Sequence, residues 1–299
     1  MKDYIARYKA LSLPGQLIAI NVCIWLVTQV LRLFTWMLTG DDLPWQALLA
    51  LHADPEFLIR TPWTLFTYMF VHADFGDNMF HLLFNMLWLW WFGQYFLRYH
   101  TGRQLLGAYI EGGLAAGIVF LLACNTMTGM QYASVVGASG AIFALVAAVA
   151  VRQPDDVIYL NFWVRIVTIR MKWFALIALA INLLDLSNGA NVGGILCHLG
   201  GMAFGVVFGL AERRGIDLTR HFNSLCDWLV TTFKPRPRMH VSEGGARHVP
   251  NDRRSDRDYN QRRREEQQRI DAILDKISKS GYDGLTAEEK AELFEKRRK

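Results

Sequence analysis

Long apolar runs alternate with short polar connections through the first two thirds of the chain. A helix needs about 20 apolar residues to cross a hydrocarbon core of about 30 Å, and in lipid the backbone must satisfy its own hydrogen bonds. Six runs qualify as candidate spans, although the fourth and fifth are short: residues 17–38, 79–97, 104–124, 138–151, 173–187 and 193–211. The pattern therefore predicts an all-α, polytopic membrane domain of six helices over residues 1–212.

The positions of Lys and Arg predict how this domain is oriented. Basic residues cluster before the first span, in the second and fourth connections and after the sixth span, whereas the third and fifth connections contain none. Because cytoplasmic loops carry an excess of Lys and Arg, we expect both termini to face the cytoplasm. The first run lacks a small-residue cleavage site, so we interpret it as a retained span rather than a signal peptide.

Charged residues become dense after about residue 212. Residues 213–260 have the composition of a disordered linker, and residues 261–299 show helical spacing of Ile and Leu followed by a Thr286–Glu289 capping box. We expect a short helical hairpin there. The basic residues at the cytoplasmic ends of the spans and the charged C-terminal segment account for the net charge of +5, so no nucleic-acid partner is predicted.

Four polar residues inside the spans are informative, because intramembrane polar groups usually face a protein interior or a water-filled cavity. Thirteen residues separate Asn85, and likewise Ser139, from the first basic residue at the cytoplasmic end of its helix, and fifteen separate His198 from its own. At about 1.5 Å per residue, all three lie roughly 20–22 Å above that end, with His81 about 6 Å higher. The sequence thus predicts a cavity open to the outside, with Ser139 at its floor.

Serine is a weak nucleophile unless a neighbouring base takes its proton, and His198 is the base at matching height. Oxyanion donors are available from the Ser139 backbone N–H at a helix N-terminus, the Asn85 amide and the His81 imidazole. Asp185 lies at the outer end of the fifth span and could orient His198 only if the helices brought it close. We therefore expect a Ser-His dyad rather than a triad.

Glycines surround these residues. A side chain on Gly137 or Gly140 would crowd the approach of a substrate carbonyl and restrict the turn before the fourth span. Small residues also allow helices to pack closely in lipid. The sixth span offers Gly201, Gly205 and Gly209 at four-residue spacing, and the fourth offers Ala144 and Ala148.

A metal site is the less favoured interpretation of the histidines. His72, His81 and His198 lack the close helical spacing of metal ligands, and no acidic ligand accompanies them. The four cysteines show no CxxC pattern and are interpreted as packing residues. We expect neither a metal nor another cofactor.

Three motifs carry a resemblance to a known family: HLLFN at residues 81–85, GASG at residues 137–140, and HLGG at residues 198–201 followed by Gly205. In this order across six spans, roughly residues 10–212 resemble the rhomboid intramembrane serine proteases of bacteria. The resemblance implies that Ser139 is the nucleophile, His198 the general base, and His81 with Asn85 part of the oxyanion site.

The resemblance also places Phe143 beneath the catalytic histidine, where family members often have Tyr. It further implies that the long aromatic first connection is a helical hairpin partly in the outer leaflet.

The function implied is endoproteolysis of single-span or otherwise membrane-anchored proteins, in or near a transmembrane helix, in a bacterial inner membrane. Two alternatives stay open. One is an inactive rhomboid-like protein that binds membrane proteins without cutting them. The other is a small transporter, against which the sequence shows no inverted repeat. The sequence predicts no oligomeric state.

Overall fold

The computed structural model describes two separate units, Met1–Lys234 and Pro235–Lys299. Within the first unit it describes residues 2–41, 45–73, 75–161, 166–189 and 191–233. In the second unit it describes residues 261, 265, 268–269, 271–277, 284–286 and 288–289.

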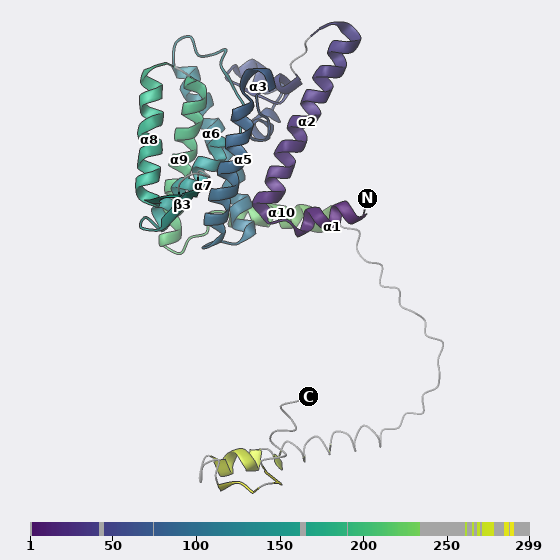
Figure 1. The fold of residues 1–299 in the computed structure, drawn as a ribbon, viewed down its shortest axis with the longest axis vertical. Coiled ribbons are helices and arrows are strands. Elements are labelled where there is room, and N and C mark those ends of the chain that lie inside the picture. Colours follow the sequence, from purple (N-terminus) through teal and green to yellow (C-terminus); the bar gives the residue numbers. More distant parts are fainter. Residues whose placement is uncertain are drawn as a thin grey trace, which may run out of the picture. The chain divides into compact units, whose positions relative to one another are not determined.

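Six long helices form the bundle of the first unit (Figure 1). They are α2 (Leu13–Thr39), α5 (Phe75–Leu97), α6 (Gly102–Thr126), α7 (Ser139–Arg152), α8 (Met171–Ser187) and α9 (Val192–Arg213). Their bounds agree with the six predicted spans to within four residues, so the all-α polytopic prediction is confirmed. In the described part of the chain, α2, α6 and α9 are long and apolar enough to cross a membrane, and α7 is a shorter apolar helix.

Helix α7 is the most enclosed helix of the bundle, with ten of its 14 residues buried. The small residues of α9 lie directly on its backbone. A Cβ atom added at Gly201 would stand 2.0 Å from the Gly140 carbonyl oxygen, and one added at Gly205 would stand 2.2 Å from that of Ala144. Such contact is possible only for glycine, because real Cβ atoms do not approach a carbonyl so closely. This packing brings the start of α7 against α9.

The first connection differs in part from the helical hairpin expected there. It contains short helices and one short strand: η1 (Trp45–Leu48), β1 (Leu51–His52), α3 (Pro55–Arg60), α4 (Thr64–Thr67) and η2 (Tyr68–Phe70). Strand β1 pairs antiparallel with β2 (Ser134–Val135) from the third connection. The Tyr68 hydroxyl donates to the Gly113 carbonyl at 2.6 Å, and the Gly137 N–H donates to the Tyr68 carbonyl at 3.0 Å. These bonds hold the irregular segment before α7 against α6.

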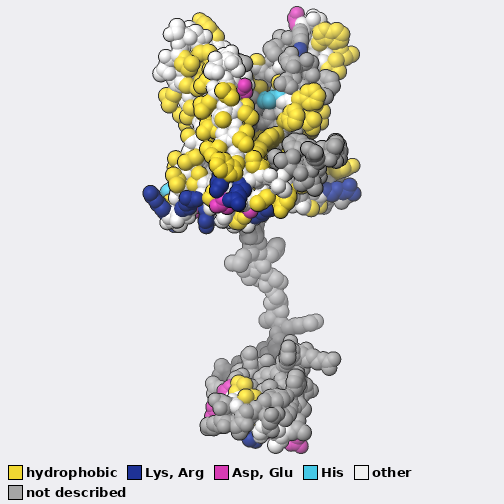
Figure 2. Space-filling model, turned by 60° about the vertical axis from the view of Figure 1, so that its left-hand side comes forward, with side chains coloured by type: hydrophobic (Ala, Val, Ile, Leu, Met, Phe, Trp, Pro, Cys, Tyr) yellow, Lys and Arg dark blue, Asp and Glu magenta, His cyan; other side chains and the backbone are white. Residues whose placement is uncertain are grey.

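The opposite end of the bundle carries the basic connections (Figure 2). In the fourth connection, β3 (Val157–Asn161) and β4 (Ile166–Arg170) form an antiparallel hairpin that the sequence analysis did not predict. Asp155, beside it, pairs with Lys172 and Arg170, which lower the pKa of its carboxyl group. The apolar flanks of the bundle and the Lys and Arg at one end are the surface expected of a protein embedded in lipid.

Two helices lie crosswise at this basic end, α1 (Lys2–Ala10) and α10 (Arg220–Phe233) (Figure 1). The prediction of a linker over residues 213–260 is therefore wrong for residues 220–233, which are helical. Apolar residues recur at helical spacing in this helix and stabilise it. The prediction relied on the mean composition of residues 213–260, and this mean conceals the spacing. Residues 234–260 lie outside the described residues.

In the second unit, residues 271–277 are helical. The Thr286 hydroxyl accepts from the Glu289 N–H at 3.3 Å, and the Glu289 carboxylate accepts from the Thr286 N–H at 2.7 Å. The predicted capping box is thus formed. The remaining residues predicted for the hairpin, Ile270, Leu293 and Phe294 among them, lie outside the described residues.

Candidate active site

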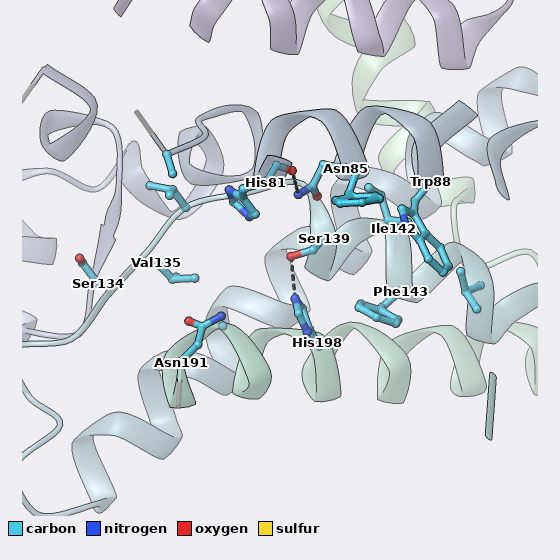
Figure 3. A pocket seen from close by; sticks show the side chains of 15 residues that line it. His81, Asn85, Trp88, Ser134, Val135, Ser139, Ile142, Phe143, Asn191 and His198 are labelled. Atoms are coloured by element: carbon cyan, nitrogen blue, oxygen red, sulfur yellow. Dashed lines mark hydrogen bonds between the residues drawn. The ribbon is translucent and has the colours of Figure 1, made fainter. Parts of the chain in front are cut away.

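Ser139 and His198 meet where α7 begins. Ser139 is the first residue of α7, and His198 lies in the second turn of α9. The Ser139 Oγ and His198 Nε2 atoms are 2.7 Å apart, a hydrogen-bond distance (Figure 3). Both side chains are only partly buried. The structure thus brings together the two groups that the height comparison placed at one level.

A third side chain, Asn182 of α8, contacts the other nitrogen of the imidazole. Its Oδ1 atom lies 2.7 Å from His198 Nδ1, while its Nδ2 donates to the Ala178 carbonyl at 2.8 Å. Because the amide nitrogen is engaged by a carbonyl, the oxygen must face the histidine. A carbonyl oxygen only accepts, so Nδ1 of His198 carries the proton. The Nε2 atom is then left with a lone pair directed at the serine hydroxyl.

Sequence reasoning missed Asn182 and considered Asp185 instead. Asp185 is exposed near the end of α8, whereas Asn182 is buried. Asn182 is the only polar side chain between Lys172 and Asp185. A lone polar residue within an apolar span was therefore the signal that could have identified it.

Gly137 allows the backbone to pass close to both the nucleophile and His81. Its φ of +127° lies in a region that favours glycine. A Cβ atom there would stand 2.9 Å from the Cε1 and Nε2 atoms of His81 and 3.8 Å from Ser139 Oγ. The absence of a side chain at Gly137 therefore lets the His81 imidazole lie close to the backbone beside the serine oxygen. A side chain at this position would push the imidazole away from Ser139.

Asn85 lies one turn along α5 from His81 and is buried. Its Nδ2 donates to the His81 carbonyl at 2.7 Å, which fixes the orientation of the amide. An amide nitrogen has two N–H groups, so one remains to act as a donor. The Ser139 backbone N–H belongs to the first turn of α7, where helix N–H groups lack intrahelical acceptors.

A cavity of about 540 Å³ connects these groups. Its lining includes polar residues of the third and fifth connections, Ser134 and Asn191, at one end and the apolar Trp88 and Ile142 at the other (Figure 3). The site therefore has room for water and for an extended peptide segment with an apolar side chain.

Two other predicted site residues contribute through packing. The Phe143 ring lies 4.6 Å from the His198 ring, centroid to centroid, and supports the imidazole from one side. A Cβ atom on Gly140 would stand 2.8 Å from the Ala116 side chain and 3.7 Å from that of Cys197. Gly140 therefore faces neighbouring helices and not the substrate approach, which corrects the expectation drawn from its place beside Ser139.

The alternative of a metal site at the histidines can also be compared with the geometry. The His72 and His81 rings lie 5.4 Å apart, but His198 is bound to Ser139 and Asn182. In the part of the chain that the structure describes, no group of three His, Cys, Asp or Glu residues has the arrangement of a metal site. The site's described contacts are those of a serine, a histidine and an amide.

Several known proteins are similar to this chain in sequence. RHOMBOID-like protein 12, mitochondrial, of Arabidopsis thaliana is 28% identical over 166 residues, covering 51% of this chain and 47% of that protein. Rhomboid protease GlpG of Klebsiella pneumoniae is 29% identical over 173 residues, covering 56% of each. Presenilin-associated rhomboid-like protein, mitochondrial, of Bos taurus is 27% identical over 136 residues, covering 43% of this chain and 33% of that protein. The chain spans about half the length of the first two relatives and a third of the last.

Two family models match separate parts of the chain. One described as a family of unknown function, DUF6576, matches residues 254–297. The other, described as Rhomboid domain, matches residues 60–215, which include all three motifs, the Ser139–His198 pair and the cavity. This protein therefore belongs to the rhomboid family.

Proposed function

We propose that this protein is an intramembrane serine endopeptidase that cleaves membrane-anchored proteins in or near a transmembrane helix. The observation that carries the proposal is the 2.7 Å contact between Ser139 Oγ and His198 Nε2 at the wall of a cavity among apolar helices. Family membership supports the same reaction class. Rhomboid protease GlpG is named as a protease, and this chain aligns with slightly more than half of it.

In the first half of the reaction, Ser139 Oγ attacks the carbonyl carbon of the scissile peptide bond while His198 Nε2 takes the hydroxyl proton. The carbonyl oxygen becomes an oxyanion. The Ser139 backbone N–H, the His81 imidazole and the second N–H of Asn85 are the proposed donors to it. His198 then gives its proton to the leaving amine, and the C–N bond breaks to leave an ester on Ser139.

In the second half, a cavity water replaces the departed amine. His198 Nε2 takes a proton from this water as its oxygen attacks the ester carbonyl, and the same proton returns to Ser139 Oγ when the C–O bond breaks. Throughout, Asn182 accepts from the Nδ1–H of His198. It thereby maintains the required tautomer and stabilises the imidazolium that forms in each half.

The substrate class follows from the position of the site. Apolar side chains cover the flanks of the bundle, so a route to the cavity from the side passes through lipid. A substrate that is already in the bilayer can reach it by sideways diffusion. Its peptide bond must leave helical structure before Ser139 can attack, and this requirement favours substrates whose transmembrane helices are unstable.

The proposed location is a bacterial inner membrane, with both termini in the cytoplasm. This orientation is supported by the gathering of the basic connections at one end of the bundle. Ion pairs join Arg98 to Asp156 and Arg103 to Asp227, so the second connection lies beside the fourth and beside the segment after α9. A shared basic end is expected to be the cytoplasmic one.

The test is incubation of the purified protein with a single-span substrate in detergent or vesicles. We expect two products from the wild type, and none above background from Ser139→Ala or His198→Ala at unchanged fold by circular dichroism. Cleavage that persists in both variants would exclude the proposed mechanism. Substrate binding by the wild type without cleavage would favour the inactive binding protein instead.

A further inference from the structure

Helix α10 has an apolar face that the rest of the described protein leaves largely open. In the described part of this helix, the large apolar side chains recur at positions that share one side, as in an amphipathic helix. The exposed Trp228 and Val230 lie at the two edges of this side, and within it lie the exposed Leu225, Leu229 and Phe233. The last of these is 79% exposed, so the far end of the helix is the least covered.

The start of α10 is fixed against α6, and this contact orients the apolar face. Gly107 lies five residues into α6, about 7.5 Å from its first residue along the axis. A Cβ atom there would stand 2.6 Å from the Cβ of Thr219 and 3.4 Å from the Phe222 ring. Phe222 therefore points back along α6 toward the spans. Leu225, Leu229 and Phe233 follow it at helical spacing and share its side.

The polar side of α10 is fixed by a separate set of contacts. The Arg103 guanidinium, in the first turn of α6, lies 2.6 Å from the Asp227 carboxylate and donates to the Asn223 carbonyl at 3.3 Å. The Asn223 amide donates to Thr219 Oγ at 3.1 Å. These bonds resist rotation of α10 about its own axis, so the apolar side stays turned toward the spans.

The surroundings of α10 carry positive charge, which suits contact with anionic lipid headgroups. α10 crosses the basic end of the bundle, where Lys and Arg gather at the border of the apolar flanks (Figures 1 and 2). Arg220 is its first residue, Arg213 and Arg214 precede it in the chain, and all three are exposed. Cationic side chains at this level pair favourably with anionic headgroups.

We infer that α10 is an interfacial helix whose apolar face inserts into the leaflet at the basic end of the bundle, with the neighbouring arginines at anionic phosphates. Its partner is thus a phospholipid surface rather than a second protein. Insertion covers the exposed apolar residues, which would otherwise face water. In this arrangement, the chain runs along the bilayer surface from residue 220 to residue 233.

The test compares two nitroxide labels on the full-length protein in vesicles of phosphatidylcholine and phosphatidylglycerol. One is attached at Leu229→Cys on the apolar face, and the matched control at the exposed Thr231→Cys, two residues and about 160° away, one turn from Asp227 on the polar face. Cys23 and Cys226 are replaced by Ala, while the buried Cys124 and Cys197 remain. Accessibility to oxygen, which concentrates in lipid, is measured against that to a water-soluble nickel complex.

Insertion predicts that the label at position 229 is reached several-fold more readily by oxygen than by nickel, with the reverse at position 231. Equal access of nickel to both labels would overturn the inference, because the apolar face would then lie in water. Loss of access to both reagents at position 229 alone would also overturn it. That result would show that protein, either the C-terminal unit or a second copy, covers the face.

Discussion

Asn182 determines which nitrogen of His198 can act as the base. Its Nδ2 is engaged by the Ala178 carbonyl, so only its oxygen can meet the histidine, and the proton is held on Nδ1. A histidine without this partner would populate both tautomers, and in one of them Nε2 cannot accept the serine proton. The amide takes the place that a carboxylate holds in Ser-His-Asp sites, as an Asn does in papain-like proteases.

Substitution of Asn182 tests this role of its amide. Asn182→Leu removes the acceptor while keeping an apolar side chain of similar size. We expect kcat to fall by roughly 10- to 100-fold, since orientation is part of the 10²- to 10⁴-fold that general-base catalysis contributes. The measurement is the steady-state cleavage of a single-span substrate, with the unfolding midpoint measured in parallel.

A matched control exists in α2. Asn21 is also a buried amide whose Nδ2 donates one turn back, to the Leu17 carbonyl at 2.8 Å, but it does not line the cavity. Asn21→Leu should therefore leave kcat unchanged even if it lowers stability. We also expect Asn182→Asp to retain more activity than Asn182→Leu, because it restores an acceptor. Equal loss of kcat in all three variants would mean that Asn182 has only a structural role.

Gly137 supports a second prediction at the residue scale. An alanine there must adopt a φ of +127° and place its methyl carbon 2.9 Å from the His81 ring. We expect Gly137→Ala to reduce cleavage by roughly 100- to 1000-fold, the scale of losing one oxyanion donor. Gly129 is the control, because it has a φ of +83° but nothing within 4 Å of an added Cβ. Gly129→Ala should cost only strain, and a similar loss of cleavage in both variants would refute a specific role for the space at Gly137.

The site residues differ in how far the sequence could predict them. The common level of Ser139, His198 and Asn85 was predictable because distance along a helix is readable from sequence. Asn182 was not, because its contact depends on how α8 is rotated about its axis and where it crosses α9. The role of Gly140 was mistaken for the same reason. Its neighbours Ala116 and Cys197 come from other helices, and the local motif does not contain them.

At the scale of elements, the contact between α7 and α9 determines whether the serine and histidine meet. The two backbones approach at three successive turns, where Gly201, Gly205 and Gly209 of α9 lie against carbonyl groups of α7. Packing of this kind stabilises helices in lipid without a hydrophobic driving force. It also fixes the spacing between Ser139 and His198.

Gly205→Ala should separate these helices, because the added Cβ would lie 2.2 Å from the Ala144 carbonyl oxygen. We expect a loss of about 1–3 kcal/mol in the free energy of unfolding, the range for overpacked cores, measured by titration with a denaturing detergent. Val207→Ala on the exposed side of α9 is the control and should have a much smaller effect. If the two substitutions destabilised the protein equally, close backbone packing at Gly205 would not be what stabilises the bundle.

The spans were predictable as elements because an apolar run is a strong and local signal. The β3–β4 hairpin was not, since its pairing arises between two short segments of a connection interpreted only for its charge. Helix α10 was missed because its apolar spacing is embedded in a segment of mixed composition. The hairpin is a short element, for which contacts made in the fold outweigh the sequence pattern.

For the whole molecule, the two ends of the bundle differ in charge and in chemistry. The cavity is lined by residues of the third and fifth connections, away from the basic end. Under the proposed orientation, water therefore enters from outside the cytoplasm while both termini stay inside. Charge segregation was readable from the sequence, whereas the shape of the cavity required the fold.

This orientation is testable with reporter fusions in a bacterial host. Green fluorescent protein fused after Phe233 should fluoresce, because it folds in the cytoplasm. Alkaline phosphatase fused after Gly129, in the third connection, should be active, because it requires the oxidising side of the membrane. The opposite pattern would show that the basic end faces outward and that the assigned topology is inverted.

The central claim is that His198 activates the hydroxyl of Ser139 within a wet cavity of the membrane domain. The most direct measurement is the intact mass of the reconstituted protein after exposure to a fluorophosphonate, with the modified residue mapped by peptide sequencing. We predict a single adduct on Ser139 that is lost in His198→Ala and slowed in Asn182→Leu. No adduct on the folded wild type, or an adduct that forms equally well without His198, would contradict the account.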